Sequence, residues 1–223
     1  MINFVSAKLL RQIWRCYRDF GADETLCRIL NRLKLFSSVH SLDFYMKELG
    51  ETEANSSPSP DNFREISREE MTSFRVAEGM PPRQEFQKQF DRGSRLFAAL
   101  KRDEVIAVNW TSTLFADLAH IRRPHVPLQK KMVYTYGLIV SPLYRKQGVA
   151  VSLKQFILRM LACEGFQLIF LAVFLKNVKI SRWHKKNGFI KWGRVFNFHC
   201  FGKDFWWTRL TSIGKKYPHL LTG

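Results

Sequence analysis

The ten residues Ser141-Pro-Leu-Tyr-Arg-Lys-Gln-Gly-Val-Ala150 join an expected strand to an expected helix and combine residue types suited to phosphate binding. A glycine at such a junction lets the backbone turn tightly, so that N–H groups at the helix start point outward. These donors and the positive end of the helix suit a pyrophosphate. Arg145 and Lys146 add positive charge, and the small Ala150 leaves room for close approach. The segment is neither a Walker A loop nor a Gly-x-Gly-x-x-Gly fingerprint.

Two motifs in register make this segment more specific. The first is Arg145-x-x-Gly148-x-Ala150, preceded by Val140-x-Pro142-x-Tyr144. The second, further along the chain, consists of Asn177, Ile180, Trp183, His184, Lys186, Gly188 and Phe189. Together they resemble the pyrophosphate-binding signature and the asparagine-helix-tyrosine-lysine-glycine-phenylalanine pattern of the GNAT superfamily of acyl-CoA N-acyltransferases. A looser resemblance in strand order extends over residues 63–210.

The resemblance implies how the acyl donor, acetyl-CoA, is held. The strand at 133–140 is expected to splay away from its parallel neighbour and to open a wedge for the pantetheine arm. Backbone groups of Leu138, Ile139 and Val140 would pair with that arm like an added strand. Asn177 would contact the pantetheine or the start of the adjoining helix. The N–H groups expected to hold the pyrophosphate belong to Arg145, Lys146, Gln147, Gly148, Val149 and Ala150.

The chemistry implied is direct attack of a neutral primary amine on the thioester, which transfers the acetyl group. The departing thiolate needs an acid, and His184 stands where the family commonly has a tyrosine. A histidine suits this role because its pKa lies near neutrality; the alternative is a half-exposed helix residue, with water protonating the thiolate. No acidic base is evident, and the nearest upstream acid is Asp117. Tyr136, beside Gly137, is the candidate relay for the amine proton, with a core aromatic as the alternative.

The elements that must position these residues alternate between strand and helix. The resemblance implies an α/β (α+β) fold: a GNAT-like mixed, mostly antiparallel sheet of six to seven strands with a central splayed parallel pair, flanked by helices. An N-terminal helical extension over residues 1–50, a polar linker over 51–60 and an acyltransferase domain over 61–223 are predicted. Strands are predicted at 42–46, 63–66, 95–101, 105–112, 133–140, 166–174, 192–199 and 205–210, and helices at 9–17, 23–33, 147–163, 177–186 and after the Ser67–Glu70 capping box.

The charge is concentrated in one part of the chain. The net charge is +17, and residues 131–223 hold 16 basic residues against Glu164 and Asp204 alone, a balance of +14. Such a surface attracts a polyanion, an acidic carrier protein or a phosphorylated small molecule. The apolar fraction of 46% excludes wholesale disorder. Four cysteines without Cys-x-x-Cys spacing indicate reduced thiols in a cytoplasmic protein, and six histidines without ligand spacing predict no metal.

Several functions stay open at this point. The donor could instead be a longer acyl group on an acyl carrier protein, which the basic surface would attract. A non-catalytic binding module with the CoA fold is a further alternative, because the tyrosine at 184 and an acidic base are missing. The acceptor is set by residues 67–93 and 113–131, which carry no recognisable motif, and the charge favours an anionic amine. Nucleic acid is disfavoured, since strand spacing explains most aromatic residues of the basic tail. The N-terminal helix could contact an anionic membrane, or pack on the domain or on a second subunit in a homodimer.

Overall fold

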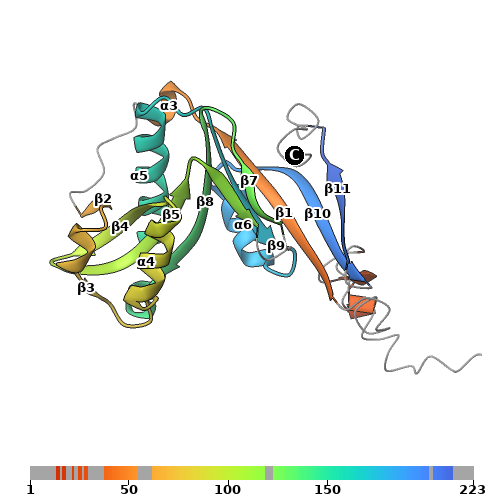
Figure 1. Cartoon of the computed structure of the whole chain (residues 1–223), viewed down its shortest axis with the longest axis horizontal. Helices are drawn as coiled ribbons and strands as arrows, with labels where there is room; N and C mark the ends of the chain where they lie inside the picture. Colours follow the sequence, from red (N-terminus) through yellow and green to blue (C-terminus); the bar gives the residue numbers. More distant parts are fainter. Residues whose placement is uncertain are drawn as a thin grey trace, which may run out of the picture. The chain divides into compact units, whose positions relative to one another are not determined.

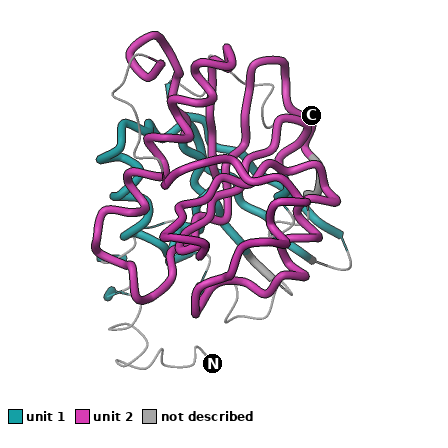
Figure 2. Tube along the Cα trace, turned by 90° about the vertical axis from the view of Figure 1, so that its left-hand side faces the viewer, with its two compact units in different colours: residues 1–45, 117–125, 172–223 teal, residues 46–116, 126–171 magenta. Residues whose placement is uncertain are grey.

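The structure is a computed structural model of the chain, and it describes residues 38–54, 62–118, 123–200 and 203–212 together with nine residues between 14 and 29. The chain divides into two compact units (Figure 2). Unit 1 comprises Met1–Tyr45, Asp117–His125 and Ala172–Gly223, and unit 2 comprises Met46–Ala116 and Val126–Leu171. The helices predicted at 9–17 and 23–33 fall almost entirely outside the described residues, and the linker predicted at 51–60 is described only up to residue 54.

Unit 2 is a sheet with helices. Its elements are α3 (Glu51–Ala54), β2 (Phe63–Ile66), the 3₁₀ turn η1 (Glu70–Thr72), β3 (Arg75–Val76), α4 (Arg83–Asp91), β4 (Arg95–Lys101), β5 (Glu104–Ser112), β8 (Met132–Val140), the 3₁₀ turn η3 (Pro142–Tyr144), α5 (Val149–Cys163) and the first residues of β9 (Leu168–Phe174) (Figure 1). The strand order in this unit is β9-β8-β5-β4-β2, with β3 beside β5. Neighbours are antiparallel except for the β8–β9 and β3–β5 pairs. The expected mixed sheet, mostly antiparallel with a parallel pair (β8–β9), is confirmed, but the described strands form a sheet of nine strands instead of the six to seven expected.

Helices cover both faces of the unit 2 sheet, and β5 shows why. Every residue of β5 after Glu104 is buried. Successive side chains of a strand point to opposite faces. Asn109 accepts a hydrogen bond from Lys154 of α5, whereas the ring of the neighbouring Trp110 packs against Phe86 of α4. Hence α5 covers one face and α4 the other, and β5 has the nearly continuous apolar sequence of a strand buried on both sides.

Helix α4 is an element that the sequence analysis did not predict. It begins directly after Pro82, and its Phe86 belongs to a buried cluster with Trp110 and the β4 residues Leu96, Ala98 and Leu100. The helix predicted after the capping box is instead the single turn η1. The box itself is present, because Ser67 N–H donates to Glu70 Oε2 at 2.9 Å and Glu70 N–H donates to Ser67 Oγ at 3.2 Å.

Unit 1 contains most of β1 (Ser38–Glu48), the helix α6 (Val178–Lys186) and the hairpin of β10 (Ile190–Cys200) and β11 (Lys203–Leu210). The strand order is β11-β10-β1, and the strands predicted at 192–199 and 205–210 form an antiparallel hairpin with Cys200 paired to Lys203 at its tip. Asp43 of β1 forms ion pairs with Lys191 at 2.8 Å and Arg194 at 2.5 Å. Two further short strands, β6 (Phe115–Leu118) and β7 (Arg123–Pro127), form a separate two-stranded sheet.

The helices that the structure describes include none long and apolar enough to span a membrane.

Candidate active site

A bulge interrupts β8 in the middle of the unit 2 sheet. Val108 pairs with Ile139 and Trp110 pairs with Tyr136, so that Gly137 and Leu138 of β8 together face the single residue Asn109 of β5. Gly137 takes a φ of +63°, and a Cβ atom there would lie 3.1 Å from Trp110 Cδ1. Glycine is therefore required both for the left-handed conformation and for the close approach of the indole ring.

A buried polar network holds this bulge from the α5 side. Asn109 Nδ2 donates to the Tyr136 carbonyl at 2.6 Å and thereby closes the gap that the extra residue opens. Lys154 of α5 donates through Nζ to Asn109 Oδ1 at 2.5 Å and to Thr135 Oγ1 at 2.9 Å. Lys154 is 2% exposed, and its burial lowers the pKa of its ammonium group to about 7. The sequence analysis did not identify this lysine.

The ladder between β8 and β9 ends at Tyr134, before the bulge at Gly137 and Leu138. Its register covers Met132 to Tyr134 on β8 and Leu168 to Phe170 on β9, although both strands continue. Burial changes at the same place, since Met132 to Thr135 are buried and the residues from Tyr136 to Val140 are half-buried or exposed. The two strands are therefore paired only over their first residues, which agrees with the expected splaying of the parallel pair. Leu138, Ile139 and Val140 lie in the half-buried part of β8 beyond this pairing.

The loop after β8 leads into α5 as the motif predicted. Ser141 is buried, the turn η3 follows, and Gly148 is the residue before the helix with a φ of +81°. A Cβ atom at Gly148 would find nothing within 4 Å, so the space in front of the helix is open. The helix starts at Val149 rather than at the predicted Gln147, because left-handed Gly148 cannot belong to it.

The N–H groups at the start of α5 are available to a ligand. Val151 and Ser152 donate to the Gly148 carbonyl, so the first turn is closed only from Val151 onward. In an α-helix the preceding N–H groups, here those of Val149 and Ala150, have no acceptor within the helix. They carry the positive end of the helix dipole, which favours an anion.

The side chains of the loop leave this position open. Arg145, Lys146 and Gln147 are exposed. Arg145 Nε donates to the Val140 carbonyl at 3.1 Å, and Gln147 Nε2 donates to the Leu143 carbonyl at 2.9 Å. Lys146 has a φ of +63°, which is uncommon for a residue with a side chain. Open space, outward N–H groups and positive charge fit a pyrophosphate.

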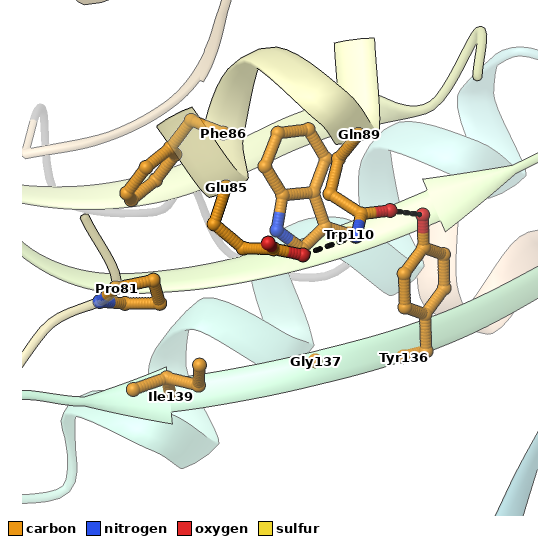
Figure 3. Close-up of a pocket in the computed structure, with 8 residues that line it drawn as sticks. All are labelled: Pro81, Glu85, Phe86, Gln89, Trp110, Tyr136, Gly137 and Ile139. Atoms are coloured by element: carbon orange, nitrogen blue, oxygen red, sulfur yellow. Dashed lines mark hydrogen bonds between the residues drawn. The ribbon is translucent and has the colours of Figure 1, made fainter. Parts of the chain in front are cut away.

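Tyr136 lies in the wall of a pocket between α4 and the β5–β8 pair, which we call the α4 pocket (Figure 3). Its volume is about 140 Å³. The Tyr136 hydroxyl donates to Gln89 Oε1 at 2.8 Å and lies 2.6 Å from Ser94 Oγ. Gln89 Nε2 in turn donates to Glu85 Oε1 at 3.0 Å. The residues that line the pocket are Pro81, Glu85, Phe86, Gln89, Trp110, Tyr136, Gly137 and Ile139.

Glu85 and Gln89 are pocket residues that the sequence analysis did not identify. Both lie in the segment 67–93, which was expected to shape the acceptor site but carried no motif. Their spacing of four residues on one helix face is the signal that could have found them. The structure also places Trp110 of β5 in the pocket wall.

Asn177 and His184 belong to unit 1, and their surroundings are those of that unit. Asn177 is the residue before α6, and its Oδ1 accepts a hydrogen bond from Ile180 N–H at 3.4 Å, so it contacts the start of the adjoining helix. His184 is 7% exposed, which makes it a buried residue rather than a half-exposed one. Its ring stacks on Tyr45 at 6.3 Å and meets the edges of Trp183 and Phe189 at 4.8 and 5.3 Å.

Tyr45, the ring partner of His184, is also in a constrained position. It is 1% exposed, and this burial raises the pKa of its hydroxyl. A hydrogen bond with Ser181 of α6 lowers the pKa but does not cancel the effect of burial. The sequence analysis assigned Tyr45 only to a short strand. Within unit 1, the two rings therefore form one buried aromatic cluster between β1 and α6.

Comparison with known proteins agrees with this geometry. Residues 62–189, more than half of the chain, match the model of the acetyltransferase (GNAT) family. The chain therefore belongs to the GNAT acetyltransferase family. No curated protein matches it significantly.

Two solved structures illustrate the structural similarity. A functionally unknown conserved protein from Staphylococcus epidermidis ATCC 12228 aligns with a TM-score of 0.51 at 14% identity, covering 78% of this chain and 66% of that one. A GNAT-family acetyltransferase from Colwellia psychrerythraea aligns with a TM-score of 0.48 at 18% identity, covering 78% of this chain and 62% of that one. This chain spans less than two thirds of the length of either, and the first of them shows the same fold.

Proposed function

We propose that this protein is an N-acetyltransferase that transfers an acetyl group from acetyl-CoA to a primary amine by direct attack. The observation that carries the proposal is the segment from Tyr136 to Ala150. There the β8–β9 ladder has ended, the strand is accessible, and an open loop leads into the N-terminus of α5.

The residues of this segment have separate proposed roles toward the donor substrate. Backbone groups of Leu138, Ile139 and Val140 would pair with the pantetheine arm in the manner of an added strand. The N–H groups from Arg145 to Ala150 would hold the pyrophosphate, supported by the side-chain charges of Arg145 and Lys146. The thioester of acetyl-CoA supplies the activated acetyl group.

The acid and the relay are proposed from position and chemistry. In the reaction a bond forms between the amine nitrogen and the carbonyl carbon, the C–S bond breaks, and the thiolate takes a proton. His184 is the proposed acid, because it occupies the tyrosine position of the motif and its ring can donate an N–H. Its burial among three aromatic rings restricts the orientation of the imidazole. Tyr136 remains the proposed relay for the amine proton, with its hydroxyl bonded to Gln89.

Calorimetry with acetyl-CoA tests the donor site. The wild-type protein should bind acetyl-CoA, and absence of heat with ligand in large excess would refute the proposal. A Gly148→Asp variant should bind at least tenfold more weakly, since a carboxylate would face the phosphates at close range, where repulsion between unit charges in water is about 1 kcal/mol or more.

The chain offers a matched control at the other end of α5. Gly165 has a φ of +82° against +81° for Gly148, and a Cβ atom at either position would find nothing within 4 Å. Gly165→Asp therefore introduces the same charge and the same backbone strain away from the proposed site. Equal loss of binding in the two variants would show that the effect comes from destabilised folding and not from the pyrophosphate site.

A further inference from the structure

The α4 pocket has the features of a binding site for a cation. Resting on the proposed function, we propose that it is the acceptor site and takes a primary amine on a short, uncharged aliphatic or aromatic arm. Glu85 anchors this amine as its ammonium form, which loses one proton to solvent through Tyr136 before the neutral amine attacks the thioester. The acceptor class is thus the reverse of the anionic amine that the charge of residues 131–223 favours.

The charge of the pocket is the first argument. The chain carries +17, yet none of the eight lining residues is lysine or arginine, and Glu85 supplies a carboxylate. Glu85 is 45% exposed, so a ligand from solvent can reach it. Its Oε1 accepts from Gln89, which orients the group, and its Oε2 lies 3.6 Å from the ammonium of Lys88, itself 68% exposed. That exposed pair is weak and easily replaced by another ammonium.

The aromatic and polar groups of the pocket support the same ligand. Phe86 and Trp110 lie with ring centroids 5.9 Å apart, and Figure 3 shows both beside the Glu85 side chain. Aromatic rings next to a carboxylate attract ammonium groups through their negative faces. Pro81 and Ile139 complete an apolar wall, which suits an uncharged arm and leaves an anion on that arm without a positive partner.

The volume limits the size of the arm. A cavity of about 150 Å³ takes a benzene-sized molecule, and the α4 pocket, at about 140 Å³, is of similar size. The inserted part of the acceptor is then an amine with a chain of several carbons or a single ring. Larger acceptors would insert only this end.

The position of the pocket connects it to the proposed donor strand. Gly137 and Ile139 line the pocket and also flank Leu138 in the accessible part of β8. The left-handed Gly137 brings the backbone against the Trp110 ring and so forms part of the pocket wall. An amine anchored at Glu85 would therefore lie beside the strand that is proposed to hold the acyl donor.

Two matched pairs of amines test the ligand class. Benzylamine and phenylglycine differ by one α-carboxylate, and so do pentylamine and norleucine. With acetyl-CoA and an assay of CoA release, kcat/KM should be at least tenfold higher for each uncharged-arm amine than for its carboxylate partner. Equal or better use of phenylglycine and norleucine would overturn the proposal.

A substitution at Glu85 tests the anchor. Glu85→Gln keeps the shape and can still accept the hydrogen bond from Gln89, but removes the charge. It should raise KM for benzylamine at least tenfold and leave KM for acetyl-CoA unchanged. Lys88→Gln is the control, because it removes the exposed ammonium next to Glu85; it should leave KM for benzylamine unchanged or lower it.

A binding measurement separates this proposal from the proposed function. Saturation-transfer NMR of benzylamine with the protein needs no turnover, and the signal should be strong for the wild type and at least tenfold weaker for Glu85→Gln. If acetyl-CoA fails to bind while benzylamine binds through Glu85, the acetyltransferase function fails and the cation site stands. If acetyl-CoA binds but benzylamine binds equally to both proteins, or to neither, the acceptor proposal is refuted alone.

Discussion

Replacing Lys154 by methionine should remove a pH-dependent part of the protein's stability. Burial lowers the pKa of Lys154 from 10.5 to about 7 in the folded protein, whereas the unfolded chain keeps the ordinary value. Between these two pH values the unfolded state binds more protons than the folded state. The free energy of unfolding therefore rises with pH over this window, as the unfavourable burial of the charged ammonium is relieved.

The size of the effect follows from the two pKa values. A fully developed difference of one proton changes the free energy of unfolding by about 1.4 kcal/mol per pH unit. At pH 7 the lysine is about half protonated in the folded protein, so the free energy of unfolding rises at about half of this rate. Above pH 8 the folded-state lysine is almost fully deprotonated, and the rise reaches the full rate. The expected increase between pH 7 and pH 9 is about 2 kcal/mol. In the methionine variant this contribution is absent, and Thr135 still donates to Asn109 Oδ1.

Urea unfolding at pH 7, 8 and 9 measures this difference. Other groups that titrate in this range act equally in both proteins, so they cancel when the stability of the Lys154→Met variant is subtracted from that of the wild type. Lys88→Met is the control, because that side chain is 68% exposed and should leave the wild-type pH dependence intact. Parallel stability curves for wild type and Lys154→Met would refute the assignment of a low pKa to the buried lysine.

Three further predictions concern the bulge, α6 and the proposed acid. Gly137→Ala should lower the free energy of unfolding by about 1–2 kcal/mol in urea titrations, since it strains a left-handed position and sets a Cβ 3.1 Å from Trp110; unchanged stability would contradict the bulge geometry. Asn177→Ala should lower the free energy of unfolding by about 1 kcal/mol because the helix cap is lost, while Asn177→Asp should keep most of the stability; thermal unfolding of both variants measures this. His184→Ala should slow single-turnover acetyl transfer about 10²-fold or more with little change in acetyl-CoA affinity, and His184→Tyr should restore much of the rate. His184→Phe, which keeps an aromatic ring in the cluster but cannot donate a proton, should stay slow; a fully active phenylalanine variant would exclude His184 as the acid.

The fold and the loop between β8 and α5 could be predicted from the sequence because their signals are local. These signals depend on residues close together in the chain: Gly148 with Arg145 and Ala150, and the strand and helix on either side of their loop. The same holds for the neighbouring strands at 95–101 and 105–112 and at 192–199 and 205–210. The family resemblance rests on the same local spacing, and the family match over residues 62–189 agrees with it. Element boundaries differ by only a few residues, as at α5, where the left-handed Gly148 delays the helix start.

The α4 pocket and the buried lysine depended on the tertiary structure. Glu85 and Tyr136 are far apart in sequence and meet only because α4 packs on the face of β5 and β8 that carries Trp110. Lys154 lies in the buried stripe of α5 with Leu153 and Ile157, a position where the helical pattern expects an apolar residue. The hydrogen-bond partner of Lys154 is Asn109. The side chain of Asn109 is held in place by the Tyr136 carbonyl, which the extra residue in β8 leaves without a partner in the strand ladder.

For His184, the sequence determined one property and the tertiary structure another. Its type and its place four residues before Gly188 identify it from the sequence as the candidate acid. Helical periodicity alone did not tell whether it was buried, because that depends on which neighbour α6 faces. In the structure the neighbour is β1 of the same unit, whose Tyr45 stacks on the imidazole. Local spacing thus determined the identity of the motif residues, whereas the packing of distant segments decided their surroundings, since contacts between such segments are formed only when the chain folds.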